Sequence, residues 1–209
     1  MPTTVFLVRH AETYGNIEGR FCGHSETELT PRGIEQARAL GLRLKDQKFD
    51  AAYSSDLSRA HRTAIHALEH HQEPLSPILD QGLREMHYGE WESLTGKDIS
   101  AKDPNVLREF FRCRIAAPGG ESVQQVRERT ASALRNIVDS HPEGTLLVVS
   151  HGNAIMAMLA ELLNVPHEST WSFAVANTSI TRMQFGKSGR MMLTGFNDFA
   201  HTESALALA

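Results

Sequence analysis

The sequence predicts an α/β fold, a three-layer sandwich whose mainly parallel central sheet is flanked by helices and carries a small helical cap insertion. Short apolar runs without polar alternation, typical of strands covered on both faces, recur along the chain. They alternate with segments of helical periodicity, as in parallel-sheet proteins. A chain of 209 residues suits one domain. We place it at residues 1–209, with the cap insertion at about 92–118 because that stretch fits the alternation poorly.

The first elements follow from local signals. The apolar run 5–8 predicts a strand, and the polar, glycine-containing residues 11–29 indicate a loop. Thr30 and Pro31 then begin a helix, because a threonine caps well and a proline at the first helical position loses no hydrogen bond. Apolar residues continue at helical spacing: Ile34, Ala37, Leu40 and Leu44.

The remaining elements repeat the alternation. A shorter strand is expected at 51–54, followed by a helix for which residues 55–58 would supply capping side chains. A third helix begins after Ser122, which opens a capping box. Residues 145–150 form the clearest buried strand, and an apolar helix is expected at about 154–163.

Composition narrows the class of protein. The chain has 21 Lys+Arg against 25 Asp+Glu and a net charge of −4, which argues against a nucleic-acid binder. Its two cysteines cannot form a disulfide framework, so a reducing cytoplasm is the expected compartment. No secretory signal is visible, and no apolar run approaches the ~20 residues of a membrane helix. Cysteine or histidine spacing typical of a zinc site is also missing.

Two histidines follow two of the most apolar strands. His10 comes directly after the first strand and His151 directly after the strand at 145–150. Ligand sites in open α/β sheets lie beyond the carboxyl ends of the strands. One histidine there is usually a structural hydrogen-bonding group, but two in the same arrangement favour a functional site. Arg9 precedes the first, and Arg59 is expected at the same edge, in the first turn of the helix after the second strand.

The two arginines make this edge locally cationic. Guanidinium groups match phosphate oxygens in a bidentate manner, so Arg9 and Arg59 favour a phosphate site. The alternative is that each arginine pairs with a carboxylate such as Glu12, Asp56 or Glu85. We prefer that alternative only for Arg62, one helical turn further along.

A set of motifs runs in order through most of the chain: Leu7-Val8-Arg9-His10-Ala11-Glu12-Thr13, Asn16, Gly23 with Leu29-Thr30, Ser54-Ser55-Asp56-Leu57-Ser58-Arg59-Ala60, Leu83-Arg84-Glu85 with Tyr88-Gly89, Gly119-Gly120-Glu121-Ser122, and Ser150-His151-Gly152. Each motif alone is weak. The ordered set resembles the histidine phosphatase superfamily, the phosphoglycerate-mutase-like enzymes. The motifs around residues 118–122 resemble its phosphatase branch.

The resemblance implies three catalytic residues, His10, Glu85 and His151. His10 would attack phosphorus to form a phosphohistidine, and Glu85 would protonate the leaving group and then activate water. Further residues would bind phosphate or line its site: Arg9, Asn16, Cys22, Gly23, Arg59, Tyr88 and Gly152. The scheme needs no metal or other cofactor, because arginines and histidines stabilise the charge. A structural ion pair between Glu85 and Arg84 remains the alternative for that carboxylate.

The favoured function is therefore a phosphomonoesterase acting on small phosphorylated metabolites. A cofactor-dependent phosphoglycerate mutase is the first alternative; such enzymes carry a longer segment after the acid, with a lysine and an adjacent arginine pair. A non-catalytic phosphate-binding relative is the second. The insertion carries basic residues that either form a solvated face or select acidic phosphometabolites: Lys97, Lys102, Arg108, Arg112 and Arg114. The sequence leaves a homodimer open.

Overall fold

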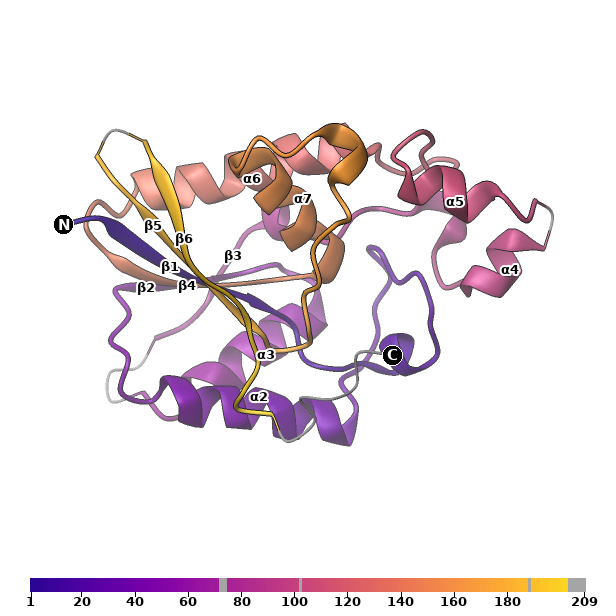
Figure 1. The fold of residues 1–209 in the computed structure, drawn as a ribbon. Helices are drawn as coiled ribbons and strands as arrows, with labels where there is room; N and C mark the ends of the chain where they lie inside the picture. The colour runs from indigo at the N-terminus through magenta and orange to yellow at the C-terminus, as the bar shows by residue number, and fades with distance from the viewer. Residues whose placement is uncertain (72–74, 102, 188, 203–209) are drawn as a thin grey trace.

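The fold is a three-layer α/β sandwich around one six-stranded sheet (Figure 1). The computed structural model describes residues 1–71, 75–101, 103–187 and 189–202. The strand order is β3-β2-β4-β1-β5-β6. Four strands are parallel: β1 (Thr3–Arg9), β2 (Ala51–Ser54), β3 (Ile78–Leu79) and β4 (Thr145–Ser150). Two strands run antiparallel to their neighbours: β5 (Ile180–Phe185), against β1, and β6 (Met191–Asp198), against β5.

Helices cover both faces of the sheet. One face carries α2 (Pro31–Leu44) and α3 (Ser58–Leu68), and the other carries α6 (Val123–Asp139) and α7 (Gly152–Leu162). Strand β1 serves both layers: Val5 and Leu7 pack in the cluster that contains Leu134 and Ile155, whereas Val8 packs with Leu40 and Ala64. This two-sided burial explains why the strand reads as a continuous apolar run.

Short helices complete the chain: α1 (Tyr14–Ile17), η1 (Gln81–Leu83), η2 (Gly89–Trp91), α4 (Gly96–Ser100), α5 (Val106–Phe111) and η3 (His167–Ser169), of which those labelled η are 3₁₀ helices. The segment predicted as an insertion holds α4 and α5, which lie beyond one end of the sheet (Figure 1). Phe110 of α5 is fully buried against Tyr88 and Trp91. The segment is thus helical, as expected, and its action as a cap stays a prediction.

Most predicted elements are confirmed, and the exceptions have physical reasons. The loop 11–29 contains the single turn α1, too short for a periodic signal. Helix α3 is capped by Leu57 without a side-chain hydrogen bond, so the predicted capping by residues 55–58 is wrong. Asp56 instead pairs with Arg84, and the Ser58 hydroxyl donates to Glu26. No helix in the described ranges is long and apolar enough to cross a membrane.

Candidate active site

The two predicted histidines meet because their strands are neighbours. Strands β1 and β4 pair in parallel with Arg9 opposite Ser150, so the next residue of each strand, His10 and His151, leaves the same edge. The backbone N–H of His10 donates to the carbonyl oxygen of Ser150 at 2.9 Å, which extends the β1–β4 hydrogen-bond ladder by one residue. The ring centroids of His10 and His151 lie 5.1 Å apart, and the residues are only 3% and 0% exposed.

His10 is held as a neutral imidazole with one defined free nitrogen. Its Nδ1 lies 2.7 Å from the carbonyl oxygen of Ala11. A carbonyl only accepts, so Nδ1 carries the proton and Nε2 keeps its lone pair. Burial, followed by the charges of Arg59 and Arg9, lowers the pKa of His10 well below its usual value. A neutral ring with a free Nε2 is the form of histidine that can act as a nucleophile.

The ring of His151 lies beside that of His10, and neither of its nitrogens has a hydrogen-bond partner among the described residues. Burial, the charge of Arg59 and the neighbouring His10 lower the pKa of His151 well below its usual value. Within the described part of the chain, both ring nitrogens of His151 and Nε of Arg9 are buried without a hydrogen-bond partner. Buried polar atoms are rarely left unpaired in proteins. Three such atoms in one place indicate a site that binds a polar group.

The two arginines are fixed by backbone carbonyls instead of carboxylates. Arg59 donates to the carbonyl oxygens of Gly23 (2.6 Å) and Ser25 (3.1 Å), and Arg9 donates to that of Val175 (2.6 Å). Neither has an ion-pair partner among the described residues, so their positive charges stay available to an anion. The carboxylate alternative is thus wrong for both.

For Arg62 the carboxylate alternative is confirmed, because its guanidinium pairs with Glu28 at the surface.

Glu85 points into the same site and is bound by backbone N–H groups. Its Oε1 accepts from Met86 N (2.9 Å) and from Ala154 N (2.8 Å), and its Oε2 accepts from Asn153 N (3.3 Å). Two of these donors belong to the first turn of α7, where the helix dipole favours an anion. The structural alternative for Glu85 is wrong: Arg84 makes a bidentate pair with Asp56 at 2.7 and 2.5 Å.

A cavity of about 250 Å³ joins these groups. It is lined by nine of the ten predicted site residues: Arg9, His10, Asn16, Cys22, Gly23, Arg59, Glu85, Tyr88 and Gly152. The tenth, His151, is reached through its contact with the His10 ring. A larger cavity of about 680 Å³ lies at the opposite edge of the sheet, where β1 begins, and its lining contains neither histidine nor cysteine.

Four of the predicted residues line the cavity without adding charge to it. The Asn16 side-chain oxygen accepts from Thr13 N (3.1 Å), which orients its amide at the start of α1. Gly23 has φ +50°, and a Cβ there would lie 2.3 Å from Glu92. Burial, with the charge of Glu85, raises the pKa of Tyr88 well above its usual value, so its hydroxyl stays neutral. Burial also raises the pKa of Cys22, so it lines the site as a thiol.

Sequence reasoning missed the residues that form the outer wall. These are Arg20, Phe21, Phe111, Met156 and Val175. Helical spacing could have found Met156, which lies one turn after Gly152 on α7. Asn177 was also missed, although its side chain donates to the His10 carbonyl oxygen at 2.9 Å. It lies in a segment without a regular pattern, so no sequence signal pointed to it.

The basic residues of the insertion that the structure describes do not line this cavity. Arg108, Arg112 and Arg114 surround the carboxylate of Glu109 at the surface. Lys97 is exposed, and Lys102 lies outside the described residues. In the described ranges, no group of three or more histidine, cysteine, aspartate or glutamate side chains is arranged to hold a metal ion.

Comparison with known proteins agrees with the motifs. The model of the histidine phosphatase superfamily (branch 1) matches residues 5–198. Adenosylcobalamin/alpha-ribazole phosphatase of Escherichia coli is 34% identical over 82% of this chain and 84% of the relative. A 2,3-bisphosphoglycerate-dependent phosphoglycerate mutase of Brucella canis is 36% identical over 78% of this chain and 82% of the relative. The solved structure of Bacillus stearothermophilus YhfR superposes with a TM-score of 0.89 at 32% identity, covering 96% of this chain and 100% of that one. The chain belongs to the histidine phosphatase superfamily.

Proposed function

We propose that the protein is a phosphomonoesterase that hydrolyses small phosphorylated metabolites through a phosphohistidine on His10. One observation carries the proposal: a neutral His10, with Nε2 free, shares a cavity with two arginines that have no carboxylate partner. That is a nucleophile placed where a phosphate dianion would bind. Phosphatases among the similar proteins support the same activity.

In the first step His10 Nε2 attacks phosphorus, forming an N–P bond while the P–O bond to the leaving group breaks. Arg9, Arg59 and His151 stabilise the charge that develops on the phosphoryl oxygens. Glu85 gives its proton to the departing alkoxide oxygen. Its Oε2 is the oxygen for that proton, since it accepts a single hydrogen bond of 3.3 Å whereas Oε1 accepts two shorter ones.

The proton that Glu85 later donates comes from solvent and is taken up when substrate binds. In the free cavity Arg9 and Arg59 face the Glu85 carboxylate, since the charge of Arg20 is matched by Glu18, and a phosphate dianion adds two negative charges. The excess negative charge favours uptake of one proton, and a carboxylate beside an anion is the group it favours. In the second step the ionised Glu85 takes a proton from water. The water oxygen attacks phosphorus, the N–P bond breaks and inorganic phosphate leaves.

The cavity favours hydrolysis over mutase activity. A mutase must hold a carboxylated metabolite while the phosphoryl group returns to it. Among described residues, Arg20 is the one cavity cation besides Arg9 and Arg59, and it is occupied by Glu18 (2.5 Å) and by the Ser93 carbonyl oxygen (2.6 Å). A substrate carboxylate would therefore compete with an existing ion pair.

A chromogenic phosphate ester in excess chelator tests the activity and its independence from metal together. We expect turnover in wild-type protein, with and without chelator, and none in His10→Ala. Acid quench of labelled substrate should trap an acid-labile, base-stable adduct in wild type only. Absence of turnover in wild type would instead favour a non-catalytic phosphate-binding relative, and loss with chelator alone would contradict the metal-free scheme.

A second assay separates phosphatase from mutase. Phosphoglycerate is offered with and without 2,3-bisphosphoglycerate, and both released phosphate and isomerised product are measured. We expect phosphate release without isomerisation under both conditions. Isomerisation that depends on the bisphosphate would identify a mutase.

A further inference from the structure

The segment that carries Glu85 lacks the support that holds the two histidines. Residues 84–88 lie between η1 and η2 and belong to no helix or strand. A general acid must stay within hydrogen-bond reach of the leaving oxygen, and a displacement of about 1 Å can cost about 10²-fold in rate. Another part of the protein must therefore fix this backbone.

The guanidinium of Arg129 fixes this backbone with all of its N–H donors. Arg129, in the second turn of α6, donates from Nη1 to the carbonyl oxygens of Gly82 and Arg84, both at 3.0 Å. Its Nη2 donates to the carbonyl oxygen of Glu85 at 3.2 Å. Its Nε and the other Nη2 hydrogen bind the carboxylate of Glu121, both at 2.8 Å. An arginine has five N–H groups, and all five are used.

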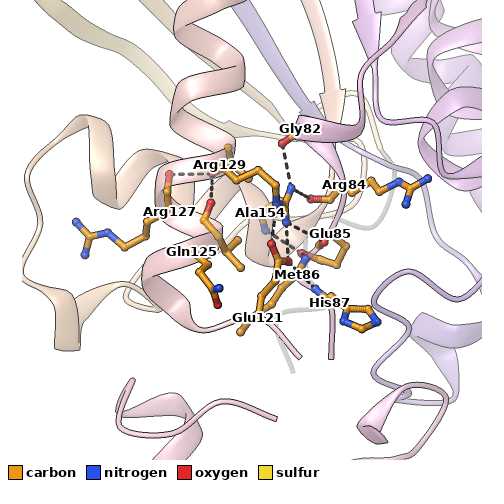
Figure 2. A network of polar contacts seen from close by, with 12 residues as sticks. Gly82, Arg84, Glu85, Met86, His87, Glu121, Gln125, Arg127, Arg129 and Ala154 are labelled. Carbon is orange, nitrogen blue, oxygen red and sulfur yellow. Dashed lines mark hydrogen bonds and ion pairs between the residues drawn. The ribbon is translucent and has the colours of Figure 1, made fainter. Parts of the chain in front are cut away.

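Glu121 extends the contact along the chain to His87. Its Oε2 accepts from the backbone N–H of His87 at 2.9 Å, and its own N–H donates to the His87 carbonyl oxygen at 2.9 Å. Figure 2 shows the guanidinium of Arg129 beside the chain that carries Glu85, with Glu121 next to His87. Burial raises the pKa of Glu121, but its bonds from Arg129 and His87 outweigh this and lower it, so the pair is charged.

We propose that the Arg129–Glu121 ion pair is a positioning device for Glu85, holding the backbone from Gly82 to His87 so that the carboxylate stays at the leaving-group oxygen. The proposal rests on the proposed function, in which Glu85 is the acid. Arg129 and Glu121 do not line the cavity, so they act through Glu85 without touching substrate.

The same helix offers a matched control. Arg127 also lies on α6 and makes four hydrogen bonds, to Glu161 (3.0 Å), Thr170 (3.2 Å) and the carbonyl oxygens of Ala160 (3.1 Å) and Val165 (3.0 Å). It ties α6 to the last turn of α7 and to the chain that follows, and its side chain points away from the Glu85 segment (Figure 2). Arg127→Lys therefore perturbs a comparable network without moving the acid.

The test compares two esters that differ in their need for a proton. The leaving group of p-nitrophenyl phosphate, p-nitrophenolate, departs without protonation. The leaving group of p-nitrobenzyl phosphate is an alkoxide, which must be protonated as it departs. With enzyme in excess over substrate, release of the alcohol or phenol reports phosphorylation of His10 alone. The inhibition constant of inorganic phosphate, measured in parallel, reports the phosphate site.

We expect Arg129→Lys to slow release of p-nitrobenzyl alcohol by about 10²-fold, to slow release of p-nitrophenol less than threefold, and to leave phosphate inhibition within twofold of wild type. Arg127→Lys should slow both esters by the same factor. Equal slowing of both esters in Arg129→Lys, an unchanged p-nitrobenzyl rate, or the same selective loss in Arg127→Lys would overturn the proposal.

Glu121→Gln keeps the test valid if Arg129→Lys does not fold. The substitution retains the size of the side chain but weakens the bond to Arg129. We expect it to slow release of p-nitrobenzyl alcohol by about tenfold or more while p-nitrophenol release changes little. Absence of this selective loss counts against the proposal. Failure of the proposed function looks different, because wild-type protein would then release neither product.

Discussion

Replacing His151 by glutamine should make the folded protein less sensitive to acid. Burial keeps His151 neutral, with a pKa well below its usual value, whereas in the unfolded chain the ring takes up a proton near pH 6.5. Below that pH the unfolded state binds more protons than the folded state, so stability falls as pH falls. The contribution of His151 is therefore present above pH 6.5 and is lost on acidification.

The size of the effect follows from proton linkage. One proton taken up only by the unfolded chain changes the unfolding free energy by about 1.4 kcal/mol per pH unit. With an unfolded pKa of about 6.5, the integrated loss between pH 7.5 and pH 5.5 is about 1.4 kcal/mol for one histidine. A glutamine fills a similar volume and does not titrate, so His151→Gln should lose about 1.4 kcal/mol less than wild type.

Urea unfolding at pH 7.5 and pH 5.5, followed by tryptophan fluorescence in phosphate-free buffer, measures this difference. Phosphate is omitted because a bound dianion would favour protonation of the ring. His70→Gln is the control, since His70 is exposed in the folded chain and the substitution should leave the pH dependence of wild type intact. Equal acid losses in His151→Gln and wild type would refute the assignment of His151 as a buried neutral ring.

Three further predictions, one with its own control substitution, test the packing and the phosphate site. Phe110→Ala should lower the unfolding free energy by about 3–5 kcal/mol in urea titrations, because the side chain is fully buried; a loss below 1 kcal/mol (a rough limit) would contradict this. Gly33→Ala should destabilise by about 1–3 kcal/mol by the same assay, since a Cβ would lie 2.1 Å from the Glu12 carbonyl oxygen, whereas Gly96→Ala, which meets only a flexible side-chain end at 3.2 Å, should be mild. Arg59→Lys should reduce kcat/KM for phosphate esters by about 10²–10³-fold and weaken inhibition by phosphate, and unchanged kinetics would exclude Arg59 from the phosphate site.

The parallel strands β1, β2 and β4 could be predicted because they lie inside the sheet, whereas the two-residue edge strand β3, with both residues exposed, was not predicted. Residues 5–8 and 146–149 are continuous apolar runs, and both belong to central strands. The antiparallel strands β5 and β6 were not predicted. Strand β6 is half-exposed along much of its length and includes Gly195 and polar residues, so it has no apolar run to detect.

Some residues of the site could also be predicted from the sequence, and others could not. His10, His151 and Arg59 follow directly from strand ends and a helix start, and the sequence therefore places them at one edge. Arg129 could not be found, because it is a polar residue at helical spacing, and such residues are normally solvated. Its role depends on where α6 lies relative to residues 82–87, which no local pattern encodes.

The two halves of the site are therefore held by different interactions. The relation of His10 to His151 is fixed by the β1–β4 ladder, which a side-chain substitution elsewhere does not alter. The relation of Glu85 to both depends on N–H groups of α7 and on side chains of α6. Perturbations of the Arg129–Glu121 pair should then impair protonation of the leaving group before they impair phosphate binding. A variant of the Arg129–Glu121 pair that lost phosphate affinity while retaining leaving-group protonation would contradict this division.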